Sequence, residues 1–169
     1  MPSHSASLHQ AHVSSLLDHS QSELNELFST LSASKLGELN GCYKGSLLAI
    51  IGLNWLPRFF RTLLYRTLQT FLNPWAGKRF DDKEGANYWF TQSGKSCFGY
   101  YTIEDDQEGG DGLPLTLLSY DVDKNLGILR PVRGEVRKIN DGLFLARMLY
   151  KTSNKMVQVL YFTLEKNND

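Results

Sequence analysis

The chain has 169 residues, which is long enough for one domain with a substantial core and too short for two domains of ordinary size. Hydrophobic residues make up 41% and charged residues 21%, which is typical of a folded globular protein rather than a disordered one. The 18 basic and 18 acidic side chains cancel, which excludes a protein that binds nucleic acid through overall positive charge.

The charges are nevertheless segregated along the chain. Residues 41–80 carry six basic and no acidic side chains, whereas residues 81–123 carry ten acidic and two basic ones. If the acidic turns lie at the opposite end of the fold from the basic block, one end of the molecule is electropositive and favours an anionic ligand.

Histidine and cysteine restrict the chemistry. No residue after position 19 offers an imidazole as a base, a triad member or a metal ligand, because the histidines are His4, His9, His12 and His19. The cysteines, Cys42 and Cys97, match no zinc-binding spacing and are too few for a disulfide scaffold. We therefore expect no metal site and no cofactor.

The N-terminal region predicts a tail followed by a helix. Residues 1–19 are expected to form a flexible tail, and residues 20–169 a single domain. The tail lacks the basic and apolar segments of a signal peptide, so we expect a cytoplasmic location. Ser20-Gln-Ser-Glu23 has the form of a capping box, and the apolar residues after it recur at helical spacing, which predicts a helix over 21–32.

A strand and a second helix are predicted next. Residues 41–50 alternate like a strand, and Gly41 and Gly45 indicate close backbone approach or strong curvature. Residues 57–72 then follow the helical period, with arginines on one face and aromatic and aliphatic side chains on the other. We consider two roles for this helix: a lid over a β-structure, or a weak contact with an anionic membrane surface. No apolar run is long enough for a transmembrane segment.

Short aromatic-rich runs after Pro74 predict six more strands. Asp141-Gly142 lies between two of them and is typical of a tight hairpin. With residues 41–50, this gives about seven antiparallel strands at meander spacing, so the predicted fold is mainly β and a closed or nearly closed antiparallel barrel. Residues 75–80 are expected to connect the second helix to the first of these six strands. The predicted strands are 86–92, 96–104, 113–121, 134–140, 143–151 and 156–165.

Several segments, taken in order, resemble a known group. Gly41-Cys-Tyr43-Lys-Gly45 resembles the G-x-W-x-G motif of uncharacterised bacterial lipocalin-like proteins, with Tyr43 in the tryptophan position, and residues 75–84 are similar to their W-x-G-K-x-F block. Residues 119–121, 136–145 and 161–162 resemble, in order, the companion domain of unknown function that follows that motif. The resemblance implies a lipocalin-like, calycin-type barrel. Related haem-binding barrels ligate iron through histidine, which the barrel region here lacks.

Seven residues are candidates for binding a ligand. Lys78 is expected either to meet an anionic head group or to lie in a solvated charged turn. Arg147 shares a strand face with two leucines, and it either closes the barrel floor or holds a ligand carboxylate. The full set comprises aromatic wall residues and cations: Tyr43, Trp75, Tyr101, Tyr120, Lys78, Arg137 and Arg147.

The sequence favours a non-enzymatic barrel that encloses a small hydrophobic or amphiphilic molecule, including an anionic, fatty-acid-like one. One alternative is a small isomerase or lyase that transfers protons through tyrosine with Asp121 or Glu135, which would need a buried carboxylate beside a tyrosine in the pocket. Another is a structural or interaction domain with a filled barrel and an exposed apolar patch.

Overall fold

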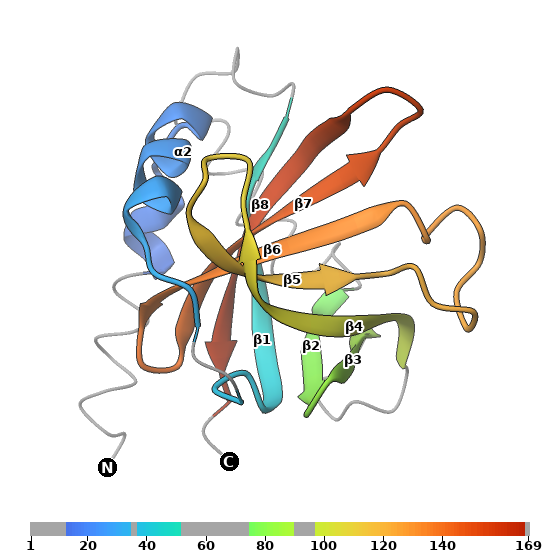
Figure 1. Cartoon of the computed structure of the whole chain (residues 1–169). Coiled ribbons are helices and arrows are strands. Elements are labelled where there is room, and N and C mark those ends of the chain that lie inside the picture. Colours follow the sequence, from blue (N-terminus) through green and yellow to red (C-terminus); the bar gives the residue numbers. More distant parts are fainter. Residues whose placement is uncertain (1–12, 35–36, 52–74, 90–96, 168–169) are drawn as a thin grey trace.

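The computed structural model describes residues 13–34, 37–51, 75–89 and 97–167. Eight strands form a closed antiparallel barrel, in which each strand pairs with the next and β8 pairs with β1 (Figure 1). The predicted helix over 57–72 lies outside the described residues. The described elements are α2 (Gln21–Thr30), β1 (Gly41–Ile50), β2 (Trp75–Asp81), β3 (Glu84–Trp89), β4 (Cys97–Glu108), β5 (Pro114–Ser119), β6 (Val132–Asn140), β7 (Leu143–Lys151) and β8 (Met156–Lys166).

The prediction of a mainly β, closed antiparallel barrel is confirmed, with one strand more than expected. The additional strand is β2, which the sequence predicted to be a connection. Its alternation is broken by a bulge between Trp75 and Gly77. A Cβ atom at Gly77 would lie 1.9 Å from the Tyr43 carbonyl oxygen, so glycine is required there and the residue adds nothing to a hydrophobic pattern.

Helix α2 packs on the outside of the barrel. The Ser20 hydroxyl accepts a hydrogen bond from the Glu23 backbone N–H, and the Glu23 carboxylate accepts one from the Ser20 N–H, which completes the capping box. Leu24 and Phe28 are buried against the outer side chains of β1, β7 and β8, including Leu48, Leu145 and Tyr161.

The segment before α2 departs from the expected flexible tail. Residues 13–16 are helical, and Leu16 and Leu17 are buried in the same cluster as Phe28. These apolar residues follow a region rich in serine and histidine, and the composition of that region led to the prediction of a flexible tail. The tail prediction therefore does not hold for residues 13–19.

The two ends of the barrel differ in their packing. At one end, which we call the turn end, lie the β2–β3, β4–β5 and β6–β7 turns; the other end, which we call the mouth end, carries the remaining connections. A packed aromatic layer fills the interior towards the turn end. Its rings meet at centroid distances of 5.3 to 5.7 Å and come from Tyr43, Phe80, Tyr101 and Phe144.

Gly45 makes room for an aromatic side chain at the mouth end. A Cβ atom at this position would lie 2.2 Å from the Trp75 indole, so only a glycine allows the ring to lie against β1. The indole in turn meets the Phe162 ring edge-on at 5.3 Å. The close approach at Gly45 is therefore that of the Trp75 side chain to the β1 backbone, whereas a Cβ atom at Gly41 would meet no atom within 4 Å.

Candidate functional site

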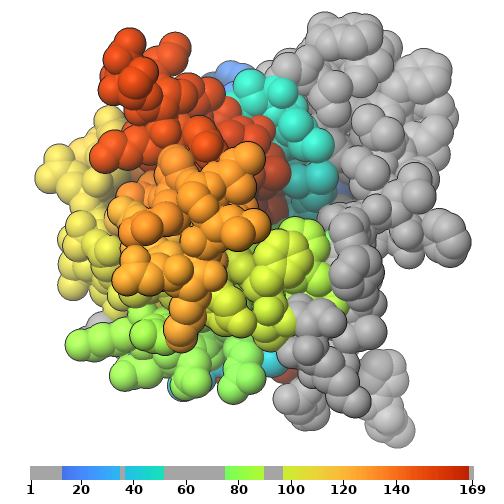
Figure 2. All heavy atoms as spheres, turned by 90° about the vertical axis from the view of Figure 1, so that its right-hand side faces the viewer, coloured from blue at the N-terminus to red at the C-terminus, as the bar shows by residue number. Residues whose placement is uncertain are grey.

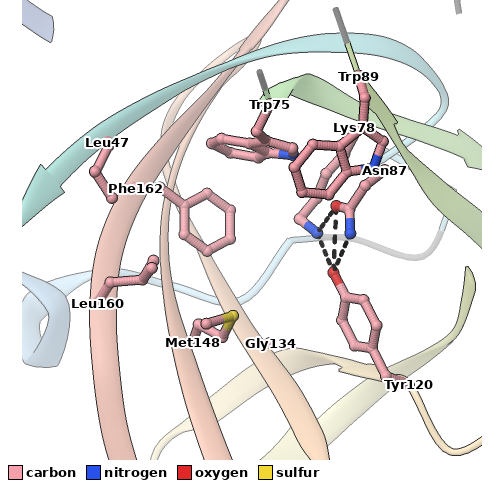
Figure 3. A pocket seen from close by; sticks show the side chains of 10 residues that line it. All are labelled: Leu47, Trp75, Lys78, Asn87, Trp89, Tyr120, Gly134, Met148, Leu160 and Phe162. Carbon is pink, nitrogen blue, oxygen red and sulfur yellow. Dashed lines mark hydrogen bonds between the residues drawn. The ribbon is translucent and has the colours of Figure 1, made fainter. Parts of the chain in front are cut away.

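A cavity of about 250 Å³ lies in the mouth half of the barrel (Figure 3). Nine of its ten lining residues come from six of the eight strands, and Tyr120 directly follows β5. Most of the lining is aromatic or aliphatic, which suits an apolar molecule. The lining residues are Leu47, Trp75, Lys78, Asn87, Trp89, Tyr120, Gly134, Met148, Leu160 and Phe162.

Lys78 brings a charged group to the wall of this cavity. Its side chain points inward from β2, and the residue is only 3% exposed. The Lys78 amine donates a hydrogen bond of 2.6 Å to the Asn87 side-chain oxygen and another to the Tyr120 hydroxyl (Figure 3). No acidic residue in the described part of the chain forms an ion pair with it, so the amine is buried without a countercharge from these residues.

Aromatic rings surround the Lys78 amine. The nitrogen lies 4.7 Å from the ring centroid of Tyr101 and 5.1 Å from that of Tyr120. The Phe162 ring follows at 5.5 Å and the Trp75 ring at 5.9 Å. Such rings attract a cation through their negative faces, so they offset part of the cost of burying the ammonium form.

Burial controls the titration of the polar groups in the cavity. Loss of solvation lowers the pKa of Lys78 to about 7, so ammonium and free amine are both populated near neutral pH. Burial raises the pKa of Tyr120 well above its ordinary value, so this phenol stays protonated. Asn87 and Tyr120 also bond to each other, at 3.2 Å through the amide nitrogen and at 3.3 Å through the amide oxygen. The site therefore has one titratable amine held by two neutral partners.

The seven predicted ligand-binding residues fall into three groups. Trp75, Lys78 and Tyr120 line the cavity together. Tyr43 and Tyr101 are buried inside the barrel but belong to the core rather than to the cavity lining. Arg137 and Arg147 lie on the outer face of the barrel, beneath α2.

Arg137 ties three segments together on that outer face. Its guanidinium group, which is fully buried, makes two hydrogen bonds of 2.7 Å to the Asp111 carboxylate. It donates further hydrogen bonds to the carbonyls of Phe28, Pro114 and Leu113 at 2.8, 3.2 and 3.0 Å. The hydrogen bonds from Arg137 lower the pKa of Asp111 to about 2. All these contacts are internal, so Arg137 anchors α2 and the β4–β5 turn to the barrel.

Arg147 also serves the outer surface. It donates a 2.6 Å hydrogen bond to the Glu135 carboxylate on the neighbouring strand, and its guanidinium carbon lies 4.4 Å from the Phe28 ring centroid. The carboxylates of the enzyme alternative are thus both outside the cavity, because Asp121 lies at the surface in an ion pair with Arg130. None of the described residues that line the cavity carries a carboxylate.

The sequence analysis missed most of the apolar lining and one polar group, Asn87. Met148, Leu160 and Phe162 have the alternation of ordinary strand residues, which does not distinguish a cavity wall from a packed core. Asn87 carried a signal, since it is a polar residue between the apolar Ala86 and the aromatic Tyr88. An amide that is half-buried among apolar neighbours favours a hydrogen-bond partner, and here Lys78 supplies one.

The acidic turns lie away from the cavity. Five acidic and no basic residues lie between Glu104 and Pro114, and the Asp81–Glu84 turn adds three acids and one lysine. Both turns belong to the turn end of the barrel, whereas residues 51 and 75, which flank the basic segment 52–74, lie at the mouth end. Neither turn contributes a residue to the cavity lining, and Glu84 of the first turn reaches Lys124 of the β5–β6 connection at 3.9 Å.

Comparison with known proteins supports the fold alone. No family model matches the chain, and no curated protein matches it. A solved structure, described as a crystal structure of a protein from Thermomonospora curvata, shares 18% sequence identity over 89% of each chain with a TM-score of 0.54. Among the described helices, none has the length and hydropathy of a membrane span.

Proposed function

We propose that this protein binds a small hydrophobic or amphiphilic molecule with an anionic head group, such as a short fatty-acid-like carboxylate, in the mouth-half cavity. The observation that carries the proposal is the buried Lys78 amine, which lies on the wall of a mostly apolar cavity. No acidic residue in the described part of the chain pairs with this amine. A ligand carboxylate supplies the missing negative charge, and its chain covers the aromatic and aliphatic walls.

The cavity volume limits the size of the ligand. Small-molecule sites usually enclose about 300–1,000 Å³, and the cavity here, at about 250 Å³, lies just below that range. A chain of medium length is therefore a better match than a long one. Binding is driven by burial of apolar surface at roughly 25 cal/mol per Å², and the Lys78 contact orients the head group.

Two other functions have less support. The enzyme alternative required a carboxylate beside a tyrosine in the pocket, and the described lining residues provide none. The filled-barrel alternative conflicts with the cavity itself. We further propose that the barrel is of the calycin, lipocalin-like type, which the order of the strands and the segment Gly41–Gly45 support. The proposal also includes a lid role for residues 57–72 and a cytoplasmic location for the protein.

Calorimetric titration with octanoate tests this function. We expect the unmodified protein to bind octanoate more tightly than octanol, because only the acid pairs with the ammonium group. Lys78→Met should weaken octanoate binding at least tenfold and leave octanol binding nearly unchanged. Lys83→Met, which removes an exposed lysine from the β2–β3 turn, is the matched control and should bind like the unmodified protein. Equal octanoate affinity in Lys78→Met, or no binding of either probe by the unmodified protein, would overturn the proposal.

A further inference from the structure

Large exposed apolar side chains gather at the mouth end of the barrel. Leu126 and Ile128, in the β5–β6 connection, are 75% and 71% exposed. Ile51, Phe98 and Met156 are also exposed and lie at strand ends or connections of the same end. Figure 2 faces this connection (orange), with the β7–β8 hairpin and the end of β1 above it. An exposed apolar group of this kind marks an interaction surface.

The connection that carries Leu126 and Ile128 is held in a defined conformation. The buried Asn125 side chain donates hydrogen bonds to the carbonyls of Tyr100 and Tyr120 at 2.7 and 2.8 Å, and it accepts one from the Tyr100 N–H at 2.9 Å. Backbone hydrogen bonds within residues 122–132 close three consecutive turns. The side chains of Leu126 and Ile128 therefore stay exposed although hydrogen bonds fix the loop that carries them.

Basic residues surround these side chains. Lys124 and Arg130 flank the Leu126–Ile128 segment, and the β7–β8 hairpin adds Lys151 and Lys155. Arg130 is paired with Asp121 and Asp123, and Lys124 lies 3.9 Å from the carboxylate of Glu84, so the hairpin lysines contribute most of the excess positive charge. The acidic turns Asp81–Glu84 and Glu104–Pro114 belong to the turn end. An anionic surface would thus attract the hairpin lysines of the mouth end and repel the Glu104–Pro114 turn at the other end.

We infer that the mouth end of the barrel docks on an anionic lipid surface, with Leu126 and Ile128 inserted among the head groups and Lys151 and Lys155 facing the lipid phosphates. Apolar tips bordered by lysine and arginine match the two parts of a membrane interface, which is apolar inside and negatively charged outside. A second copy of this chain fits less well, because two identical basic rims repel each other. This surface differs from the 57–72 segment and does not require the cavity to be occupied.

Flotation of the full-length protein with lipid vesicles tests the inference. We expect binding to vesicles of 70% phosphatidylcholine and 30% phosphatidylglycerol, and at least tenfold weaker binding to pure phosphatidylcholine. The double variant Leu126→Ser/Ile128→Ser should bind the anionic vesicles about tenfold or more weakly, since two inserted side chains are lost. Lys151→Glu/Lys155→Glu should weaken binding and reduce its dependence on salt.

Matched controls separate docking from other effects. Leu113→Ser removes an apolar side chain that is 39% exposed at the turn end, and should bind vesicles like the unmodified protein. Lys78→Met should also keep vesicle binding, so failure of the cavity proposal and failure of this one are distinguishable. Equal binding by the Leu126→Ser/Ile128→Ser variant, equal binding to neutral vesicles, or self-association through these residues without vesicle binding would overturn the inference. Thermal melting of each variant verifies folding.

Discussion

The guanidinium group of Arg137 holds Phe28 in two ways: it donates a 2.8 Å hydrogen bond to the Phe28 carbonyl and lies 4.5 Å from the centroid of the Phe28 ring. Arg147 lies at 4.4 Å from the same ring. One aromatic side chain of α2 thus meets both arginines that the sequence suggested as ligand contacts. Their positive charge is used to fix the helix to the barrel.

We predict that Asp111→Asn destabilises the protein by about 3 kcal/mol, because it leaves the buried Arg137 guanidinium without its countercharge. Chemical denaturation of the variant and the unmodified protein measures the difference in the free energy of unfolding. Asp121→Asn, which breaks an exposed pair with Arg130, is the control and should cost less than about 1 kcal/mol. Similar losses in both variants would contradict the anchoring role of Arg137.

The same ion pair should contribute to acid unfolding. The pKa of Asp111 is lowered to about 2 in the folded protein by its hydrogen bonds with Arg137, and the carboxyl has its ordinary, higher pKa when unfolded. Its stabilisation is therefore full above about pH 4 and is lost as the pH falls towards 2. With allowance for the partial exposure of the carboxylate, we expect this loss to be about 1–2 kcal/mol. The stability difference between the unmodified protein and Asp111→Asn should narrow over this range, and a constant difference would contradict the assignment.

Lys78 should make the folded protein less stable at low pH. The pKa of Lys78 is about 7 in the folded protein, whereas an ordinary lysine, as in the unfolded chain, has a pKa of 10.5. Between pH 7 and pH 10.5 the unfolded chain therefore binds more protons than the folded protein does. The cost of burying the ammonium is full below pH 7 and disappears as the pH rises towards 10.5, an effect on the order of a few kcal/mol. We expect Lys78→Met to be more stable than the unmodified protein at pH 6, with a smaller advantage at pH 10. Lys83→Met should show no such trend in denaturation experiments.

The affinity for octanoate should fall as the pH rises, whereas the stability of the folded protein should increase. Above pH 7 the Lys78 amine loses its proton, so the charge that attracts the carboxylate disappears and affinity falls by up to about tenfold per pH unit. Titrations at pH 6, 8 and 9 test this dependence. Octanol serves as the uncharged control, whose affinity should stay nearly constant. An octanoate affinity that is flat over this range would place the head group away from Lys78.

Gly45→Ala should disturb the cavity through Trp75. The added methyl group would lie 2.2 to 2.7 Å from indole atoms, so the ring must move from its place against β1. We expect a loss of about 1–3 kcal/mol in stability and weaker octanoate binding. Gly110→Ala is the control, because a Cβ atom there meets no atom within 4 Å. Unchanged tryptophan fluorescence and affinity in Gly45→Ala would contradict this role of Gly45.

The strands that were predicted well have regular local signals. Residues 143–151 were predicted with the bounds that the structure has, since alternation and the Asp141-Gly142 turn define them; Gly142 adopts a φ of +83° that favours glycine. Strand β2 was predicted to be a connection because Gly77 and the bulge beside it interrupt the alternation of apolar and polar residues. Local sequence therefore specified the hairpins but not the irregular strand that begins at Trp75.

The candidate site was predictable in its chemistry and less so in its geometry. The alternation in β7 correctly grouped Arg147 with Leu145, apart from Phe144 and Ala146. It could not indicate which group faces the barrel interior, because α2 covers the outer face and both faces of the strand are apolar. Lys78 could be identified as a candidate cation, but its burial depends on Asn87 and on four aromatic rings, of which only that of Trp75 lies on the same strand.

The pairing of β8 with β1 has a consequence for how the chain folds. Lys44 lies opposite Glu165, so the last seam joins residues from nearly opposite ends of the sequence. During synthesis the barrel remains open, with β1 and β7 presenting unpaired edges, until β8 leaves the ribosome. Such a distant closing contact favours slow folding. A chain that ends before residue 156 would lack its closing strand, and we expect it to aggregate rather than form a smaller barrel.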